Sequence, residues 1–134
     1  RILQYSSMPG TSRHHWGTDL DVYDKQSIMH SGQALRLIQQ EYLSADGPCY
    51  RLNQWLDQHA SQFGFNRPYA TYSGGVAAEP WHLSYAAIAS KMSLAFDIEA
   101  LKSALSHARL PGLELVLLKL EDIYQRFILN KGRV

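Results

Sequence analysis

The chain has 134 residues, which allows one compact domain and leaves no room for a second enzymatic one. Thirteen Lys and Arg against twelve Asp and Glu give a net charge of +1, so composition predicts no bulk attraction to nucleic acid or anionic membranes. No apolar run approaches the roughly 20 residues that span a bilayer. A single cysteine, Cys49, excludes an internal disulfide and every zinc site built from CxxC pairs.

Short strands and loops are expected in the first thirty residues, which are rich in Ser, Gly, His and Asp. Residues 2–5 and 20–23 favour extended structure. Polar and apolar side chains alternate with a period of two around residue 20. Asp19 and Asp21 are therefore expected to share one face of a strand.

Two helices are predicted in the middle of the chain. Apolar residues recur at helical spacing from residue 33 up to a stop signal at Gly47-Pro48. A second apolar stripe runs from Pro48 to Phe63, and Gly64 follows where a left-handed cap residue belongs.

Strands and then helices are predicted in the second half. Residues 66–72 and 76–87 are β-compatible, and the second stretch has an irregular start at Pro80. Asp97 is the predicted N-cap of a helix to about residue 108, and a long C-terminal helix is expected to run through Phe127. With no repeat or linker, these elements predict a single α+β domain over residues 1–134.

Two segments, residues 12–21 and 79–82, concentrate the residue types that bind a transition metal. Catalytic zinc takes three protein ligands, commonly His nitrogen and carboxylate oxygen, and keeps a fourth position for water. Two histidines and one aspartate supply such a set. A further carboxylate near the water is needed to accept its proton, and Glu79 is the candidate.

The first segment, Ser-Arg-His-His-Trp-Gly-Thr-Asp-Leu-Asp, resembles the S-x-H-x-x-G-x-A-x-D signature of the zinc D-alanyl-D-alanine carboxypeptidases of the VanY type. Glu-Pro-Trp-His at 79–82 resembles the E-x-W-H of that family, and both motifs occur in the family's order. The resemblance implies that His14, Asp21 and His82 bind Zn²⁺ and that Glu79 is the general base. It also implies a small antiparallel sheet carrying the zinc site, flanked by helices as in LAS and hedgehog-like folds, and the peptidoglycan stem peptide as substrate.

Other residues of the two motifs each fit more than one role. Ser12 and Trp16 are candidate substrate-binding residues, although Ser12 also fits a turn and Trp16 a packing position. Trp81 is expected to be a packing residue. His15 is the alternative to His14 as a metal ligand. The remaining histidines are expected to lie outside the site: His30, His59 and His107.

Two departures from the family pattern affect the prediction. Asp19 stands where the signature has alanine and, on the same strand face as Asp21, can compete for the metal. The family also has a substrate-anchoring arginine in a Y-R-S-like segment upstream, which neither Arg1 nor Arg13 matches. We therefore expect that anchor upstream of Arg1, in an N-terminal part that this chain lacks. The family's substrate further implies a periplasmic or cell-envelope location.

Glu79 and His82 are three residues apart, and residues three apart on a regular strand point to opposite faces. Both can face one metal only if the backbone departs from a regular strand between them. Pro80 lacks a backbone N–H and is tolerated at the start of a strand or at a bulge. Glu79 is therefore expected to precede the regular strand. A helix beginning at Pro80 would also bring both side chains to one face, but the family resemblance favours the strand.

These observations predict a zinc-dependent carboxypeptidase that hydrolyses D-alanyl-D-alanine or related D-amino-acid bonds in stem peptides. An L,D-carboxypeptidase or an endopeptidase of the same family would use the same metal set. A non-catalytic zinc-containing module that binds peptidoglycan would have no use for Glu79 as a base. A non-haem iron oxygenase also uses two His and one carboxylate, but its usual H-x-D spacing is absent. Nothing in the helix stripes demands a partner subunit.

Overall fold

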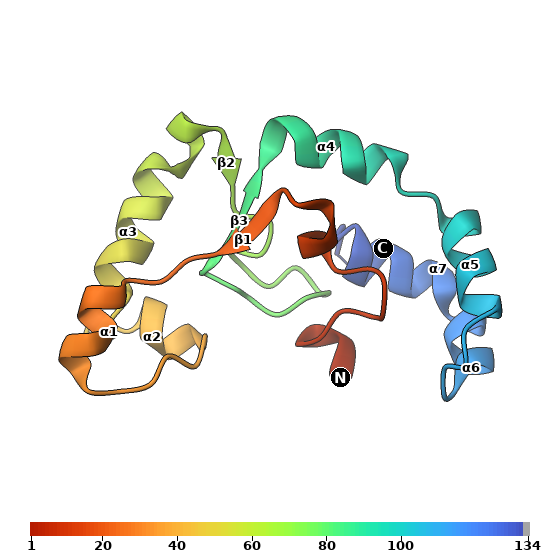
Figure 1. Ribbon diagram of the computed structural model, residues 1–134, viewed down its shortest axis with the longest axis horizontal. Helices are drawn as coiled ribbons and strands as arrows, with labels where there is room; N and C mark the ends of the chain where they lie inside the picture. The colour runs from red at the N-terminus through yellow and green to blue at the C-terminus, as the bar shows by residue number, and fades with distance from the viewer. Residues whose placement is uncertain (133–134) are drawn as a thin grey trace.

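A small antiparallel sheet lies between two groups of helices in the computed structural model, which describes residues 1–132 (Figure 1). The sheet has the order β1-β3-β2, with β1 at Asp19–Asp21, β2 at Phe65–Asn66 and β3 at His82–Tyr85. The antiparallel register of β1 and β3 sets Asp21 opposite His82 and Asp19 opposite Ser84. Both metal-site motifs thus meet on neighbouring strands, within the predicted α+β class.

The first group of helices packs beside the sheet and covers part of it. Leu83 of the central strand packs against Leu56 and Ala60 in one core cluster. A second cluster contains Ile28 and Tyr42 with the buried Cys49. The elements of this group are α1 (Lys25–Ser31), α2 (Gln39–Leu43), α3 (Tyr50–His59) and the 3₁₀ turn η3 (Ala60–Phe63).

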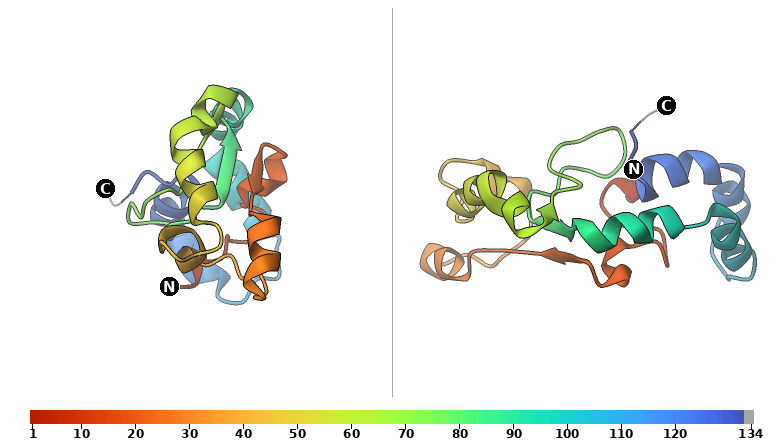
Figure 2. Two further views of the ribbon diagram at one scale, coloured as in Figure 1. Left: turned by 90° about the vertical axis from the view of Figure 1, so that its left-hand side faces the viewer. Right: turned by 90° about the horizontal axis from the view of Figure 1, so that it is seen from above.

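The second group lies at the opposite end of the elongated molecule and has its own apolar core, which includes Met8, Leu105 and Ile123 (Figure 2). Helix α4 (Ala86–Ala95) leaves the end of β3 and leads to this group. Its members are α5 (Ile98–Ser106), α6 (Leu113–Leu118), α7 (Leu120–Ile123) and the π-helical turn η4 (Tyr124–Ile128). No helix among residues 1–132 is both long enough and apolar enough to cross a membrane.

The first thirty residues are more helical than the sequence predicted. The predicted strand at residues 2–5 is wrong, because the 3₁₀ turn η1 (Ile2–Gln4) lies there. A second 3₁₀ turn, η2 (Arg13–Trp16), precedes β1. Helix α1 was not predicted, although the side chain of Asp24 accepts a hydrogen bond from the backbone N–H of Ser27, as an N-cap does.

The later elements confirm some predicted boundaries and correct others. Gly64 has a φ of 79° and ends η3, and Asp97 caps α5 by accepting from two backbone N–H groups, as predicted. Helix α2 begins later than expected, after Leu37, whose positive φ of 52° interrupts a right-handed helix. The long C-terminal helix is wrong: it is broken at Lys119 into α6 and α7, followed by η4.

The two predicted strands of the second half are much shorter than expected. Residues 66–72 leave the sheet after Asn66, where Arg67 is followed by Pro68. Residues 76–87 contribute only β3, and the chain is already helical at Ala86. The loop between β2 and β3 carries Tyr69 and Glu79 to the edge of the candidate site.

Candidate metal centre and cleft

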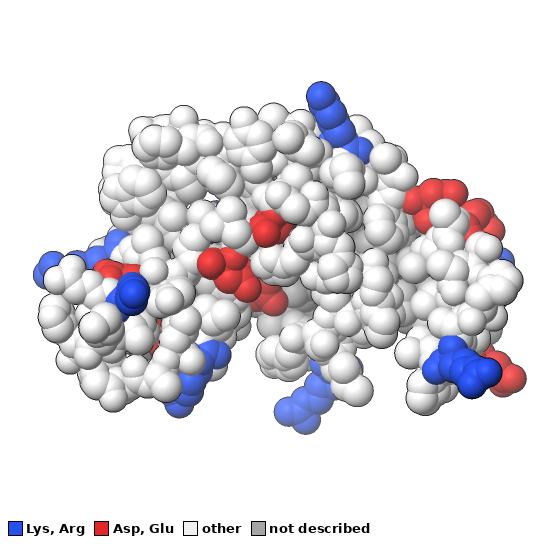
Figure 3. Space-filling view, viewed as in Figure 1, with Lys and Arg blue, Asp and Glu red and all other residues white. Residues whose placement is uncertain are grey.

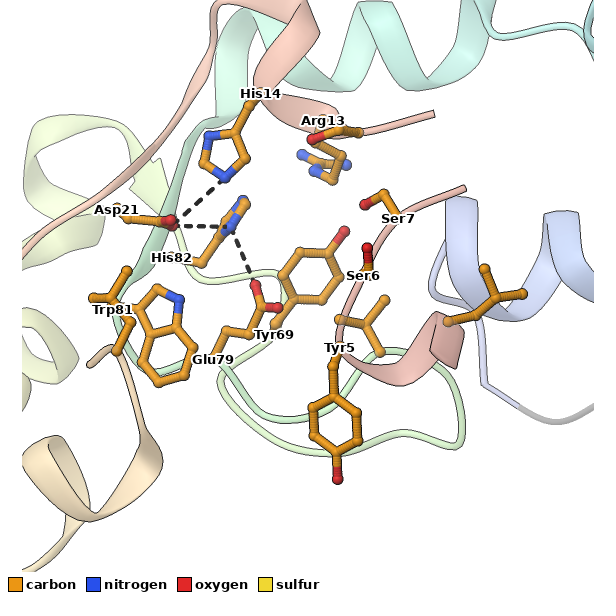
Figure 4. A pocket seen from close by; sticks show the side chains of 14 residues that line it. Tyr5, Ser6, Ser7, Arg13, His14, Asp21, Tyr69, Glu79, Trp81 and His82 are labelled. Atoms are coloured by element: carbon orange, nitrogen blue, oxygen red, sulfur yellow. Dashed lines mark ion pairs between the residues drawn. The ribbon is translucent and has the colours of Figure 1, made fainter. Parts of the chain in front are cut away.

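Three of the predicted site residues converge at one point between η2, β1 and β3. His14, Asp21 and His82 each offer one ligand atom, and these atoms all lie within 4.8 Å of one another (Figure 4). Gly17, with a φ of 70°, turns the chain between η2 and β1 and so allows His14 to face the end of the strand. The Nε2 atom of His14 lies 3.6 Å from Oδ1 of Asp21. This trio has the donor types of a catalytic zinc site.

The two ring nitrogens of His82 have different surroundings. Nε2 lies 2.8 Å from Oδ2 of Asp19, inside the protein. Nδ1 is buried and has no hydrogen-bond partner among residues 1–132. Carboxylate oxygens of Asp21 and Glu79 lie 3.3 and 3.4 Å from it, on the cleft side. An orphaned nitrogen facing two carboxylates fits a cation, so these residues suit a divalent metal.

The carboxylates control the protonation of His82. Burial alone would lower its pKa, but Asp19, Asp21 and Glu79 outweigh that effect and raise the pKa to about 10. Asp19 is itself buried, which would raise its pKa, yet hydrogen bonds from His82, Arg13, Thr18 and Ser84 hold the pKa of this carboxyl far below its ordinary value. In the absence of a metal, a proton on Nδ1 therefore takes the place of the cation.

Glu79 lies just before β3, as predicted from Pro80. Its backbone N–H donates to the carbonyl of Tyr69 at 2.8 Å, and its carbonyl accepts from the backbone N–H of His82 at 3.1 Å. These two bonds turn the chain so that the side chain of Glu79 faces His82 rather than the opposite side of the sheet. The guanidinium group of Arg67 donates to the carbonyl of Pro80 and holds the same turn.

A cleft opens on the Nδ1 side of His82. Its walls combine hydroxyl groups and one guanidinium with apolar surface, and they include Ser12 but not Trp16. In Figure 4 the Tyr69 hydroxyl lies between Arg13 and Ser6, on the opposite side of Glu79 from Trp81. The residues that line it are Leu3, Tyr5, Ser6, Ser7, Ser12, Arg13, His14, Asp21, Leu37, Tyr69, Val76, Glu79, Trp81 and His82.

Sequence reasoning missed Tyr69, Ser6 and Ser7 as cleft residues. The Tyr69 ring packs edge-on against His82, with ring centroids 4.8 Å apart, and burial raises the pKa of its hydroxyl to about 12. The two serines reach the cleft because η1 folds the N-terminal segment beneath the site. No motif or spacing signals these contacts, since all three depend on loop conformation.

Trp16 and His15 take no part in the cluster. The Trp16 ring lies beneath the guanidinium of Arg13, 4.6 Å from its carbon, and packs against Phe96. His15 is exposed and lies outside the cluster of His14, Asp21 and His82. Trp81 packs on Tyr42, as expected of a packing residue, and also forms part of the cleft wall.

Asp19 shares a sheet face with Asp21, as predicted, because both carboxylates contact the ring of His82. It does not compete for the same position, since its oxygens lie on the Nε2 side and are occupied by four donors. On the outer surface, acidic side chains lie near the centre of the face that shows β1 and β3 and also at its right-hand end, and basic side chains lie towards its rim (Figure 3). The acidic side chains near the centre favour a cation there.

Comparison with known proteins agrees with the motif assignment. A sequence model of the VanY family, described as D-alanyl-D-alanine carboxypeptidase, matches residues 1–88. An uncharacterized protein of Haemophilus influenzae is 33% identical over 119 residues, which cover 87% of this chain and 89% of that protein. No solved structure matches. The matched region contains both motifs and the whole cluster, and the chain belongs to the VanY family of D-alanyl-D-alanine carboxypeptidases.

Proposed function

We propose that the protein is a zinc-dependent carboxypeptidase that hydrolyses D-alanyl-D-alanine or related D-amino-acid bonds in peptidoglycan stem peptides. The observation that carries this proposal is the juxtaposition of His14, Asp21 and His82 with Glu79, which stands beside the trio without belonging to it. A purely structural zinc site is closed by four protein ligands and has no use for an adjacent base. Membership of the VanY family supports the same reaction class.

Three side chains would hold the zinc ion: His14 through Nε2, Asp21 through a carboxylate oxygen and His82 through Nδ1. When bound, zinc supplies Lewis acidity, which polarises a carbonyl group and promotes the ionisation of water near neutral pH. The remaining steps belong to the protein.

Glu79 is placed to act as the general base. One of its oxygens lies 3.4 Å from Nδ1 of His82, and its side chain is 22% exposed, so the carboxylate reaches both the metal position and the cleft. In this role Glu79 accepts the proton of the attacking water at its carboxylate oxygen and later donates it to the nitrogen of the leaving amine. Tyr69 lines the same cleft, and its hydroxyl group offers a donor to an oxygen atom of a bound peptide.

The cleft continues past Glu79 and Trp81 into a second hollow lined by Ile38, Gln39 and Ala78. This hollow offers room for peptide beyond the cleft that contains the candidate metal site. This extension supports an endopeptidase of the same family as the second candidate function. In either case the substrate belongs to the cell wall, and we propose a periplasmic or cell-envelope location.

The test compares wild type with Glu79→Ala. The variant is expected to retain one zinc per chain and to lose turnover by about 10²–10⁴-fold, the contribution typical of a general base. Turnover is measured on synthetic tetrapeptide and pentapeptide stems and on a cross-linked dimer, and mass spectrometry identifies the fragment released.

Release of the terminal D-alanine from the pentapeptide supports the carboxypeptidase, and cleavage of the dimer alone supports the endopeptidase. Full turnover in Glu79→Ala would contradict the assignment of the base. Peptide binding without hydrolysis in zinc-loaded wild type would favour the non-catalytic module. Stoichiometric iron in place of zinc, measured by elemental analysis of protein purified without added metal, would favour the oxygenase.

A further inference from the structure

Asp19 touches both histidines of the cluster, through two different groups. Its side-chain Oδ2 lies 2.8 Å from Nε2 of His82. Its backbone carbonyl oxygen lies 3.1 Å from Nδ1 of His14. In each ring the nitrogen that meets Asp19 is the one that does not face Asp21. One residue thus engages the far nitrogen of both rings.

The carboxylate of Asp19 is held rigidly. Its side chain is fully buried, and Oδ2 also accepts from Nε of Arg13 at 2.7 Å. Oδ1 accepts from the hydroxyl groups of Thr18 and Ser84, each at 2.8 Å. Arg13 is fixed in turn by Ser84, because its Nη2 donates to the Ser84 hydroxyl at 2.7 Å. Four donor groups surround this buried carboxylate, so it acts as an acceptor toward each of them.

These contacts decide which nitrogen carries the proton in each neutral ring. A neutral imidazole has one N–H and one lone pair. The acceptor at Asp19 Oδ2 requires the proton of His82 on Nε2, which leaves the lone pair on Nδ1, the atom without a hydrogen-bond partner. The backbone carbonyl of Asp19 likewise requires the proton of His14 on Nδ1, which leaves the lone pair on Nε2 facing Asp21.

We propose that Asp19 is a positioning residue that fixes the tautomer and ring orientation of His82 through its carboxylate, and of His14 through its backbone carbonyl, so that both lone pairs face the metal position. This inference rests on the proposed zinc site. Ligating histidines commonly donate their second N–H to a carboxylate or carbonyl, and such partners raise metal affinity by about 10–100-fold. Arg13 serves this network, since its guanidinium group is occupied by Asp19 and Ser84.

The two contacts can be separated by substitution. Asp19→Ala removes the carboxylate beside His82 and keeps the backbone carbonyl beside His14. Asp19→Asn keeps the shape of the side chain and removes its charge. Thr18→Val is the matched control, because it removes one donor to the same carboxylate without touching either histidine.

The primary measurement is the zinc dissociation constant, obtained by competition with a chromophoric chelator. We expect it to rise by about 10–100-fold in Asp19→Ala, by about tenfold in Asp19→Asn, and by less than about threefold in Thr18→Val. ¹⁵N-resolved NMR of the zinc-loaded wild type is expected to show His82 protonated on Nε2 and His14 protonated on Nδ1. In Asp19→Ala the His14 pattern is expected to persist while the His82 ring becomes mobile.

The outcomes separate this inference from the proposed function. Unchanged zinc affinity in both Asp19 variants, with wild type that binds zinc and hydrolyses stem peptide, overturns the positioning role alone. His82 protonated on Nδ1 in the zinc-loaded wild type also overturns it. Failure of wild type to bind zinc overturns the proposed function as well. Thermal unfolding of the metal-free variants identifies any that do not fold, and Asp19→Asn, of nearly unchanged shape, then decides.

Discussion

Residues 1–88 and the C-terminal helices are built on different principles. All buried polar or charged residues among residues 1–132 lie at or before Ser84, and they include Asp19 and His82. After residue 88 the buried residues are apolar, and Leu105, Ile123 and Ile128 are among them. The VanY model matches only the first region. Burying a polar group costs free energy unless it has a hydrogen-bond partner. In the first region Asp19 has such partners in His82 and Ser84, whereas the C-terminal region buries apolar side chains.

The two regions nevertheless meet at the loop that carries Tyr69 and Glu79. Arg126 of η4 donates two hydrogen bonds to the carbonyl of Gly74, at 3.0 and 2.8 Å. Asn130 donates to the carbonyl of Pro68 at 3.0 Å. A Cβ atom added to Gly75 would lie 1.7 Å from the carbonyl oxygen of Arg126, so only glycine permits this close approach. The C-terminal segment thus holds the loop between β2 and β3 in place through these hydrogen bonds.

The largest effect on zinc binding and turnover is expected from a substitution of His82, at the centre of the polar region. His82→Ala is expected to abolish stoichiometric zinc and to reduce turnover by more than about 10³-fold, because it removes a candidate ligand and leaves Asp19 without its imidazole partner. Zinc per chain and turnover of a pentapeptide stem are measured together. His107→Ala, at an exposed position after α5, is the control and is expected to behave as wild type. Normal zinc content in His82→Ala would contradict the proposed site.

The next largest effect is expected in the C-terminal apolar core, where a substitution should lower the free energy of unfolding and leave zinc binding unchanged. Leu105→Ala empties a buried position in the C-terminal core and is expected to cost about 2–5 kcal/mol of unfolding free energy. Urea unfolding followed by circular dichroism measures the loss. Leu118→Ala, at a 76% exposed leucine, is expected to change it by less than about 0.5 kcal/mol. At urea concentrations below its unfolding midpoint, Leu105→Ala is expected to bind zinc with the affinity of wild type. A large loss of zinc affinity would mean that the C-terminal core also affects the candidate metal site.

The pH dependence of zinc affinity tests the polar region through the protonation of His82. The pKa of His82 in the metal-free protein, about 10, lies above the ordinary value of about 6.5. Its protonated form therefore stabilises the metal-free fold fully below pH 6.5, and this contribution is lost as the pH rises toward 10. Zinc must displace that proton, so its affinity is expected to increase by up to about tenfold per pH unit between pH 6.5 and 8.5. Chelator competition measures this slope, and a flat profile would contradict it.

The smallest effect concerns the contact between the two regions. Arg126→Ala removes the two hydrogen bonds to Gly74 and is expected to lower turnover by about three- to tenfold while zinc content stays unchanged, because the loop that carries Glu79 loses its support. Gln125→Ala, which loses only a contact to Glu121, is the matched control. Equal turnover in both variants would show that the C-terminal helices do not position the loop.

The sequence predicted the candidate cluster better than it predicted the elements that carry it. His14, Asp21, His82 and Glu79 were identified from residue type, spacing and resemblance, and the structure brings all four together. The strands were overestimated because β-compatible residues between Phe65 and Tyr85 also suit an extended loop. In that loop, hydrogen bonds from Arg67 and Asn130 replace those of a sheet.

The cleft walls could not be predicted in the same way. Ser6, Ser7 and Tyr69 have no motif, and they reach the site because η1 and the loop between β2 and β3 fold against it. Trp16 carries a motif position but packs on Arg13 and Phe96 instead. A side chain in a loop has no fixed period along the chain, so its direction depends on packing that the sequence pattern does not encode.

By itself, the sequence determined the family, the α+β class and the donor set of the candidate metal site, because ligand chemistry and strand alternation are local properties of the chain. Only the tertiary structure decided which atoms Asp19 contacts. Alternation placed it beside Asp21, but the register of β1 against β3 set the two carboxylates on opposite sides of the His82 ring. The physical reason is that an imidazole has two distinct nitrogens, and which one meets which carboxylate depends on pairing between residues more than sixty positions apart.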